Sequence, residues 1–499
     1  MSVMPRSVTE GTYLGQKGYT IPKSLISVDE QRWLREELMA RPYLPKAPAQ
    51  PPAFPVYRES ASKIYVPRHF GTDTYGEADS NRMPQGEECP LEFTGQLRDY
   101  QTRIVRAYMK AIDPATGGGG LLEVPCGRGK TVIALNILAL LGRKTLVVVH
   151  KTFLMNQWIE RIEQFLPGAR IGRIQGQDLD IDDKDIVIGM LQSLSMKDYA
   201  PGTFASFGLT IVDECHHISS EVFSRSLLKI VTPCTLGLSA TMQRKDGLTP
   251  VFKMFLGDVA YKEQQRTGDP VLVKAIQYTH PDSEFAEDLL DYRGNPAYSS
   301  MITKLCDFNR RSEFILDVLR HEKTLVSGQQ TMVLSQNKSL LSYLYNAIQA
   351  RGMGTVGFYV GGMKEAALKA TESCEFVLAT YAMAAEALDI KTLTTLILAT
   401  PRTDVRQAVG RILREKHERP LVVDVVDMHD VFQSQWRKRL AYYRKQGYRV
   451  LDGQSTTYPK GKWRDVSQGR TKKAGQPRNS GGIKSGGGCL LQLNASGLS

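Results

Sequence analysis

The chain has 499 residues and carries 64 Lys or Arg against 52 Asp or Glu, so its formal net charge is +12. A chain of this length is too long for a single hydrophobic core and predicts about three domains. Its longest apolar stretch, VIALNILALLG, reaches about half of the ~20 residues that a bilayer span needs and contains Asn136. We therefore expect a buried helix there and no membrane partner. The positive charge favours a polyanionic partner such as nucleic acid, and a basic protein without such a partner is the alternative.

The first residues and the cysteines argue against two further classes of protein. MSVMPRSVTEGTY has no basic segment followed by an apolar core, which argues against a secretory signal and for a protein that stays inside a cell. The 7 cysteines include no C-x-x-C pair. We therefore expect reduced thiols rather than a zinc cage or a disulfide framework.

Changes of pattern divide the chain into five expected segments. Residues 1–95 hold short mixed segments and a proline cluster, YLPKAPAQPPAFPVY, and predict an accessory region with an extended or looped wrap. In residues 96–260 and again in 311–457, short apolar runs alternate with helical periodicity, which predicts two tandem βαβ domains with mostly parallel sheets. We expect a polar connector at 261–310. The Gly/Ser-rich basic tail at 458–499 cannot bury enough apolar surface to order itself, so we expect it to be disordered.

The stretch VPCGRGKT resembles a phosphate-binding loop, although it begins with Val124 where the strict pattern G-x-x-x-x-G-K-[ST] has glycine. An apolar run precedes it and a helical stretch follows, which is the context that such a loop requires. Gly127 and Gly129 let backbone N–H groups turn toward phosphate oxygens. Lys130 can reach the β- and γ-phosphates, and Thr131 can hold Mg²⁺. A plain glycine turn between strand and helix is the alternative.

Two acids, Asp213 and Glu214, end the apolar run in LTIVDECHH. A carboxylate at the carboxyl end of a strand is where a phosphate-bound Mg²⁺ needs a ligand, and the neighbouring Glu can orient and deprotonate an attacking water. A solvated acidic turn is the alternative. The adjacent His216 and His217 have no Cys or His at metal-ligand spacing, so we expect a coupling or packing role for both.

A basic pair follows in QAVGRILR. On a helix, Gln407, Gly410, Arg411 and Arg414 recur every three or four residues, so the two guanidinium groups share one face. A solvated basic face is one interpretation. Aimed across a cleft at the γ-phosphate, the pair would instead act as an arginine finger, which is worth ~10³ to 10⁵ in rate. The arginines can reach the γ-phosphate only when ATP lies between the two domains and contacts both.

Together these motifs resemble those of superfamily 2 helicases. PCGRGKT is similar to motif I, DECH to motif II, SAT to motif III and QAVGRILR to motif VI. The branch that contains XPB and the phage helicase UvsW is the most similar, because LRDYQ resembles its adenine-contacting segment, HKTFLMNQWIERIEQFLPG its motif Ia and ATYAMAAEALDI its motif V. The resemblance covers about residues 96–426. SKIYVPRHFG and WRKRLAYYRKQGY, on either side, resemble the helicases of large cytoplasmic DNA viruses, including the poxvirus transcript-release type.

The resemblance implies two RecA-like (P-loop) domains, ATP and Mg²⁺ as cofactors, and a set of residue roles. Two departures, Val124 and Cys215, remove no group that touches phosphate or metal. The implied roles are an adenine contact by Gln101; nucleotide contacts by Pro125, Cys126, Gly127, Arg128, Gly129, Lys130 and Thr131; Mg²⁺ binding by Thr131 and Asp213; general-base catalysis by Glu214; γ-phosphate sensing by Gln407, Arg411 and Arg414; a ribose or coupling role for Asp389; and coupling of hydrolysis to strand grip by Ser239, Ala240 and Thr241.

The implied activity is that of an ATP-driven helicase or translocase. DNA is the favoured strand, because the XPB-like features lean toward duplex DNA; an RNA helicase and a non-hydrolysing scaffold are the alternatives. The expected partners beyond nucleic acid are transcription or replication proteins, with the chain a monomer or weak oligomer in the cytoplasm or nucleus, including those of an infected cell, or in a virion. The loops expected to contact nucleic acid contain Lys151, Thr152, Gln192, Ser193, Ser335, Asn337 and Thr380.

The segment HDVFQSQWRKRLAYYRKQG, at 429–447, interleaves aromatic and basic residues. Such a helix can stack on nucleic acid or steer it. A docked helix with a solvated basic face is the alternative.

Overall fold

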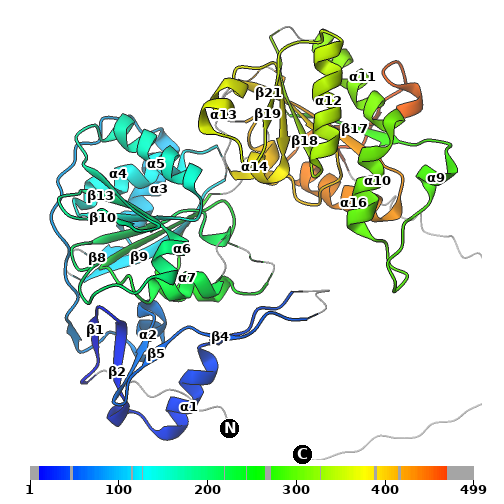
Figure 1. The fold of residues 1–499 in the computed structure, drawn as a ribbon. Helices are drawn as coiled ribbons and strands as arrows, with labels where there is room; N and C mark the ends of the chain where they lie inside the picture. The colour runs from blue at the N-terminus through cyan, green and yellow to red at the C-terminus, as the bar shows by residue number, and fades with distance from the viewer. Residues whose placement is uncertain are drawn as a thin grey trace, which may run out of the picture.

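The computed structural model contains an N-terminal module (the described part of residues 10–83), a first α/β unit (99–262) and a second α/β unit (272–465), which are blue, cyan to green, and green to orange in Figure 1. The residues that the structure describes are 10–44, 49–113, 116–125, 127–217, 220–242, 244, 246–263, 271–325, 328–386, 390, 392–413, 417 and 419–468. The prediction that the tail is disordered from residue 458 is wrong for its first part, because Tyr458 and Trp463 pack against the second unit and β24 (Arg464–Asp465) pairs with β23 (Arg449–Gln454). The rest of the tail, 469–499, lies outside the described residues.

The first α/β unit is built on one mostly parallel sheet with the order β12-β11-β13-β10-β14-β15-β9-β16, and β8 also pairs with β9. Only the β11–β12 and β8–β9 pairs are antiparallel. Its strands are β8 (Ile112–Asp113), β9 (Gly117–Glu123), β10 (Thr145–Val149), β11 (Ile171–Gln175), β12 (Asp178–Leu179), β13 (Ile186–Met190), β14 (Leu209–Val212), β15 (Cys234–Ser239) and β16 (Val259–Lys262). Its helices are α3 (Asp99–Met109), α4 (Lys130–Leu141), α5 (Thr152–Phe165), α6 (Leu191–Met196), α7 (Ser220–Leu227) and α8 (Thr249–Leu256).

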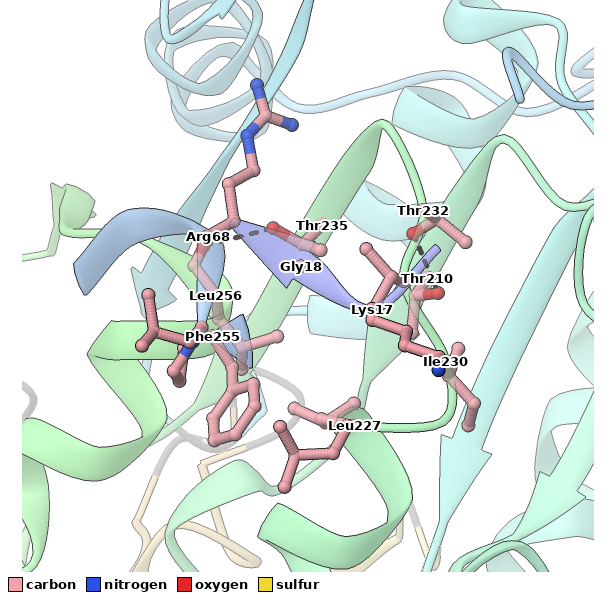
Figure 2. A pocket seen from close by; sticks show the side chains of 14 residues that line it. Lys17, Gly18, Arg68, Thr210, Leu227, Ile230, Thr232, Thr235, Phe255 and Leu256 are labelled. Atoms are coloured by element: carbon pink, nitrogen blue, oxygen red, sulfur yellow. Dashed lines mark hydrogen bonds between the residues drawn. The ribbon is translucent and has the colours of Figure 1, made fainter. Parts of the chain in front are cut away.

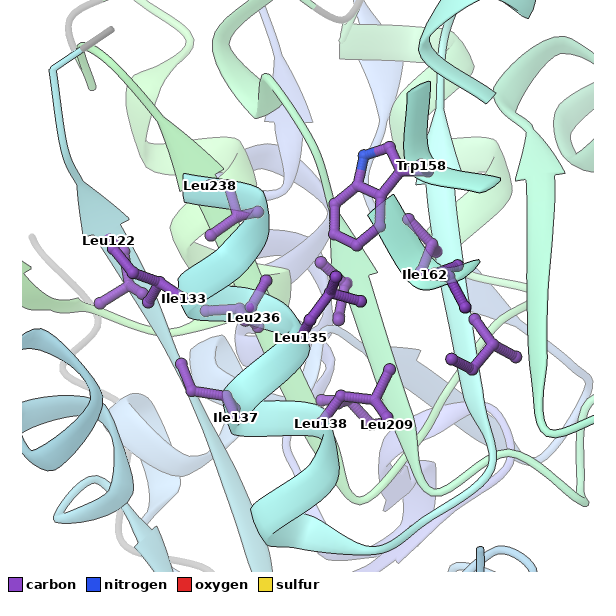
Figure 3. Close-up of a cluster of buried hydrophobic side chains, with 14 of the residues drawn as sticks. Leu122, Ile133, Leu135, Ile137, Leu138, Trp158, Ile162, Leu209, Leu236 and Leu238 are labelled. Carbon is purple, nitrogen blue, oxygen red and sulfur yellow. The ribbon is translucent and has the colours of Figure 1, made fainter. Parts of the chain in front are cut away.

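Helix α4 confirms the buried helix that the longest apolar stretch predicted. Figure 3 shows it lying against the sheet, with Ile133 and Leu135 among side chains from β9 and β15 and next to Trp158 of α5. Apolar residues surround the helix because it is sandwiched between the sheet and neighbouring helices. Within the described residues, no helix is both long and apolar enough to cross a bilayer.

The second α/β unit repeats this plan with the order β19-β20-β18-β21-β22-β17-β23-β24, in which only the last pair is antiparallel. Helices lie on both faces of each sheet (Figure 1), so the predicted fold class, two tandem α/β units with mostly parallel sheets, is confirmed. Its strands are β17 (Leu272–Tyr278), β18 (Gln330–Ser335), β19 (Val356–Tyr359), β20 (Phe376–Thr380), β21 (Leu393–Leu398), β22 (Leu421–Asp427), β23 (Arg449–Gln454) and β24 (Arg464–Asp465). Its helices are α9 (Ser283–Ala286), α10 (Tyr298–Asp307), α11 (Asn309–Leu325), α12 (Lys338–Ala350), α13 (Glu365–Thr371), α14 (Tyr381–Glu386), α15 (Arg406–Val409) and α16 (Asp430–Lys445).

The segment 261–310, expected to be a connector without a clear period, contains a strand in the interior of the second sheet. Strand β17 pairs in parallel with both β22 and β23, and α9 and α10 follow it. The sequence LVKAIQY mixes polar and apolar residues, so it lacks the continuous apolar run by which we recognised most of the parallel strands. Lys274 accounts for one of the polar positions, since its ammonium pairs with Glu322 at 2.8 Å.

Helix α16 is a docked helix, as the second interpretation of its sequence proposed. Trp436, Arg439 and Tyr443 are buried in the second unit, and Arg439 binds both carboxylate oxygens of Asp424 at 2.7 and 2.9 Å. The stacking interpretation is therefore wrong for these aromatic rings. The exposed cations of the helix, such as Lys438, form its solvated face.

The N-terminal module contains a five-stranded sheet with the order β5-β6-β2-β1-β7, packed against two helices, and a separate pair β3–β4. The described part of the proline cluster is extended and includes β4. Its strands are β1 (Tyr13–Gly15), β2 (Gly18–Pro22), β3 (Met39–Ala40), β4 (Phe54–Pro55), β5 (Arg58–Glu59), β6 (Lys63–Val66) and β7 (Ser80–Asn81), and its helices are α1 (Val28–Glu37) and α2 (Arg68–Tyr75).

Helix α2 docks the N-terminal module onto the first unit. The Arg68 guanidinium donates to the carbonyl oxygens of Pro233 and Thr116 at 2.6 and 3.0 Å. His69 lies against β9, where a Cβ on Gly119 would come within 2.8 Å of its Nε2. Figure 2 shows the two parts meeting around a small apolar cavity between Lys17 of the module and helices α7 and α8. Close backbone approach thus depends on glycine in β9.

Substitution Gly119→Ala tests this packing. The added Cβ would meet Thr235 Oγ1 at 2.1 Å and the Leu256 carbonyl oxygen at 2.5 Å, so we expect a loss of about 1–3 kcal/mol in the free energy of unfolding. Denaturant unfolding of the purified protein measures it. Gly168→Ala is the matched control, because nothing lies within 4 Å of a Cβ at Gly168. Equal stability of the two variants would contradict the packing.

A second prediction concerns pH. Burial, with the nearby positive charge of Arg68, lowers the pKa of His69 to about 4 from an unfolded value of about 6.5. The folded state therefore binds fewer protons, so the stability due to neutral His69 is full above pH ~6.5 and is lost as pH falls toward 4. As the pH falls from about 6.5 to about 4, we expect the free energy of unfolding of the parent to decrease by up to about 3 kcal/mol relative to that of His69→Phe. Parallel pH titrations of unfolding would contradict this if the two curves kept a constant offset.

Candidate active site

The phosphate-type loop lies between β9 and α4, as its sequence context predicted. Gly127 and Gly129 adopt left-handed backbone conformations, with φ of 78° and 73°, and α4 begins at Lys130. Val124 is fully buried, and its N–H donates to the Ser239 carbonyl oxygen at 2.8 Å. The valine therefore continues β9 beside β15, and the glycines that turn the chain come after it.

Two carboxylates meet this loop from the carboxyl end of β14. The Lys130 ammonium pairs with Glu214 Oε1 at 3.0 Å. Glu214 has a positive φ of 46°, and its N–H donates to Asp213 Oδ1 at 2.9 Å. The other Asp213 oxygen accepts a hydrogen bond from Trp158 Nε1 at 2.8 Å. These contacts fix the direction of both carboxylates at the loop.

Burial raises the pKa of Asp213 above its usual value, and the charge of Glu214 raises it further. Lys130 and the Trp158 indole oppose this shift. A buried carboxylate whose ionised form is disfavoured gains from a nearby cation. Among the described residues, no group of three His, Cys, Asp or Glu could cage a metal ion. A hard cation here would therefore need other oxygen ligands, such as the Thr131 hydroxyl and phosphate oxygens.

The segment around Gln101 packs on the outside of the loop. Gln101 Nε2 donates to the Arg128 carbonyl oxygen at 3.2 Å, and a Cβ on Gly129 would come within 2.6 Å of that nitrogen. The Arg128 guanidinium lies 3.9 Å from the centroid of the Tyr100 ring and pairs with Glu263 at 2.7 Å. The structure thus brings Gln101, the expected adenine contact, to the loop, while Pro125 and Thr131 flank its turn.

A chain of polar contacts joins these acids to the next strand. His216 Nδ1 lies 2.6 Å from Ser239 Oγ and 3.4 Å from Glu214 Oε2. Ser239 Oγ also bonds the backbone of Thr241, on the far side of Ala240. Arg244 donates to the His216 carbonyl oxygen at 2.9 Å. The predicted coupling residues therefore contact the acidic pair through His216.

The expected nucleic-acid loops of the first unit lie together at the same edge of the sheet. Gln192 Nε2 donates to the His150 carbonyl oxygen at 3.3 Å, so the loops after β13 and β10 meet directly. Ser193 Oγ accepts from the Gly176 N–H at 3.0 Å. The remaining two residues start α5: Lys151 is its N-cap and Thr152 its first residue. The position of these side chains agrees with one continuous contact surface.

In the second unit, the corresponding loops follow β18 and β20. Ser335 is fully buried, and its Oγ accepts from the Asn337 N–H at 3.0 Å, so it shapes the turn. Asn337 caps α12 through its side chain. Thr380 ends β20, and the hydroxyl of the next residue, Tyr381, donates to the Thr400 carbonyl oxygen at 2.6 Å.

The basic motif of the second unit is only partly helical. Helix α15 ends at Val409, one residue before Gly410, so the long helix on which we aligned the two arginines is not formed. Arg411 is buried and donates through Nε to the Ala384 carbonyl oxygen at 2.7 Å, while Gln407 lies on α15. Glycine is a weak helix former and favours this early end. Cys126, Asp389 and Arg414 lie outside the described residues.

The two α/β units touch through α5 and α13 (Figure 1). Lys369 pairs with Glu160 at 3.0 Å, and Asn156 donates to Glu365 at 2.9 Å. Phe153 packs against the cores of both units. Helix α5 follows the expected nucleic-acid loop at Lys151 and Thr152, so the contact lies near that loop in the first unit.

Sequence reasoning missed three contacts at the site. Trp158 was noted only as part of a resembling motif, although its indole orients Asp213. Arg244 and Tyr100 were given no role, and they hold the backbone of His216 and Arg128. A lone Trp or Arg on a helix or loop carries no positional signal, so only the fold could show these pairs.

Comparison with known proteins agrees with this geometry. Residues 94–244 match the family described as "Type III restriction enzyme, res subunit". The chain is 34% identical over 456 residues to "Putative ATP-dependent RNA helicase L396" of Acanthamoeba polyphaga mimivirus, covering 88% of this chain and 86% of that protein. It is 28% identical over 393 residues to "Putative ATP-dependent RNA helicase QP509L" of African swine fever virus, covering 72% and 75%.

Two further matches are more distant. The chain is 34% identical over 171 residues to "DNA 3'-5' translocase XPB2" of Sulfurisphaera tokodaii, which covers 34% of this chain and 36% of that protein. The crystal structure of T4 UvsW aligns with a TM-score of 0.33 at 15% identity, covering 86% of this chain and 96% of that chain.

Substitution Trp158→Phe tests the orientation of Asp213. Phenylalanine keeps most of the packing but removes the N–H that holds one carboxylate oxygen. Loss of a group that orients a metal ligand costs about 10- to 100-fold in metal affinity. We expect the Mg²⁺ concentration for half-maximal ATP hydrolysis to rise by that factor. Trp33→Phe, on α1, is the control, and an equal Mg²⁺ dependence of both variants would contradict the role.

Proposed function

The chain belongs to the superfamily 2 helicases and is an ATP-dependent helicase or translocase, and from this premise we propose that it moves on DNA by hydrolysing ATP-Mg²⁺ between its two α/β units. The observation that carries the proposal is the Lys130–Glu214 pair at 3.0 Å, between the phosphate-type loop and the end of β14. Lys130 is the one cation of α4, and the pair joins it to Glu214, the carboxylate next to Asp213.

We assign the phosphate contacts of ATP to the loop at 125–131. The left-handed glycines turn the backbone of the loop, and the start of α4 adds its partial positive charge and the backbone N–H groups of its first turn. A triphosphate that reaches Lys130 competes with Glu214 for the ammonium. Its binding would therefore release the Glu214 carboxylate, which can then accept a proton from the attacking water.

The donor set also suits Mg²⁺, since Asp213 supplies a buried carboxylate and Thr131, the second residue of α4, supplies a hydroxyl. When bound, Mg²⁺ neutralises charge that develops on the phosphates. Trp158 keeps Asp213 pointing at the loop, and the raised pKa of Asp213 reflects burial that a cation would offset. We assign γ-phosphate sensing to Gln407 and Arg411 of the second unit, which would act when both units enclose ATP.

Two variants test the hydrolytic site. Lys130→Ala removes the phosphate contact and Glu214→Gln removes the base while keeping its shape, so we expect each to lower nucleic-acid-stimulated ATP hydrolysis by about 10²-fold or more. Steady-state rates with single- and double-stranded DNA and RNA, at two salt concentrations, measure the effect. Lys253→Ala is the control, because Lys253 is a half-buried cation on α8 that pairs with Asp258 and not with the site. Rates equal to the parent would refute the assignment.

RNA is the second candidate strand, because the two viral relatives are named as RNA helicases. The name of the archaeal relative supports DNA. Strand displacement on matched DNA and RNA duplexes separates the two. Unwinding of DNA supports our proposal, and unwinding of RNA alone would transfer the activity to the second candidate. Glu214→Gln serves as the inactive control in both reactions.

A further inference from the structure

Helices α1 and α2 pack on one face of the N-terminal sheet, and the opposite face combines aromatic rings with positive charge. Residues alternate along its strands, and the inward set, including Leu14, Ile21 and Ile64, forms the core of the module. The outward set forms a row across the sheet in which Tyr13 pairs with Thr20, and Thr20 pairs with Tyr65. We call this surface the outer sheet face.

Cations lie directly over both tyrosine rings of this face. The Arg82 guanidinium is 4.1 Å from the centroid of the Tyr13 ring, and Lys63 donates to the Tyr13 hydroxyl at 3.1 Å. The Lys17 ammonium is 4.9 Å from the centroid of the Tyr65 ring. Lys17 and Arg82 are also exposed to solvent. Cation–π contacts thus hold long basic side chains in a defined layer over the sheet.

The strand residues of the outer sheet face carry charge of one sign, and Arg58, at the β5 edge, interacts with Asp198 of the first unit. Among the described strand residues that the pairing places on it, none is acidic; they are Tyr13, Gly15, Gly18, Thr20, Pro22, Arg58, Lys63, Tyr65 and Ser80. The acidic residue of β5, Glu59, alternates to the other side and pairs with Lys23 and Arg35. A surface of cations and aromatic rings without carboxylates is complementary to a polyanion that carries flat rings.

We propose that the outer sheet face binds a nucleic acid strand, with Lys17, Lys63 and Arg82 on its phosphates and the two tyrosines beside its bases. The proposal rests on the proposed function, which supplies the nucleic acid, and it adds a contact outside the α/β units. Because Arg68 and His69 fix the module to the first unit, a strand held there moves with that unit. The module thereby gives the first unit a second contact with the strand.

The test compares two double variants of the full chain that lose the same charge from the same module. Lys17→Glu with Arg82→Glu alters the outer sheet face. Arg32→Glu with Arg41→Glu alters the opposite, helical side, where these side chains are 73% and 62% exposed. Fluorescence anisotropy with labelled single-stranded DNA and RNA, without ATP and over a salt series, gives affinity and its salt dependence.

We expect the outer-face variant to bind about 10- to 100-fold more weakly and to lower the slope of log affinity against log salt by about 1.4, which corresponds to two lost contacts on a single strand. The control should stay close to the parent. Thermal unfolding checks the fold, and Lys17→Gln with Arg82→Gln replaces the first variant if it is unstable. Equal weakening in both variants, or no weakening in either, overturns the proposal.

The same proteins separate this inference from the proposed function. With nucleic acid at saturation, the outer-face variant should hydrolyse ATP at the parental rate, because none of its changes touches the loop or the acidic pair. A parent that hydrolyses no ATP with any strand would refute the proposed motor and leave the binding result standing. A difference between the DNA and RNA probes identifies the strand that the face holds.

Discussion

The rest of the structure depends on one constraint, which is the burial of Asp213 beside Glu214 at the end of strand β14. Removing Asp213 from water costs several kcal/mol unless hydrogen bonds and opposite charge compensate it. The compensation comes from Trp158 on α5 and Lys130 on α4. Both helices must therefore lie on the same face and begin at the same edge of the sheet. In Figure 3, α4 and α5 meet beside side chains of β14 and β15, and this packing holds both helices on one face of the sheet.

Parallel strands extend this constraint to the remaining loops. Each strand that returns by a crossover helix ends at the same edge, so segments far apart in the sequence meet there. The loops after β10 and β13 meet through Gln192 and His150, and β15 places Ser239 next to His216. A change in the position of Glu214 can thus be passed to Ser239 through His216. In the second unit, the turn built by Ser335 repeats the same relation between strand end and helix start.

The sequence predicted the parts of this arrangement that periodicity encodes. Continuous apolar runs identified most parallel strands, and glycine spacing identified the loop before α4. Strand β17 was missed because polar residues interrupt its apolar pattern, including Lys274, whose charge is neutralised by Glu322 on a helix 48 residues away. Local patterns carry no information about such partners. For the same reason Trp436 and Tyr443 suggested a stacking surface, although the buried pair between Arg439 and Asp424 holds their helix against the sheet.

The strengths of the contacts between parts indicate which parts move together. The N-terminal module joins the first unit through hydrogen bonds from the Arg68 guanidinium to two backbone carbonyl oxygens, and Val231 of the first unit packs against the core of the module. The two α/β units are joined partly by the pair Lys369–Glu160, whose side chains are 60% and 54% exposed. Exposed pairs of this kind contribute about 0–1 kcal/mol and weaken with salt. This ion pair between the units can therefore be exchanged at little cost, whereas separating the module would disrupt packing against β9. The polar contact between the two α/β units is thus weaker than the packing that holds the module to the first unit.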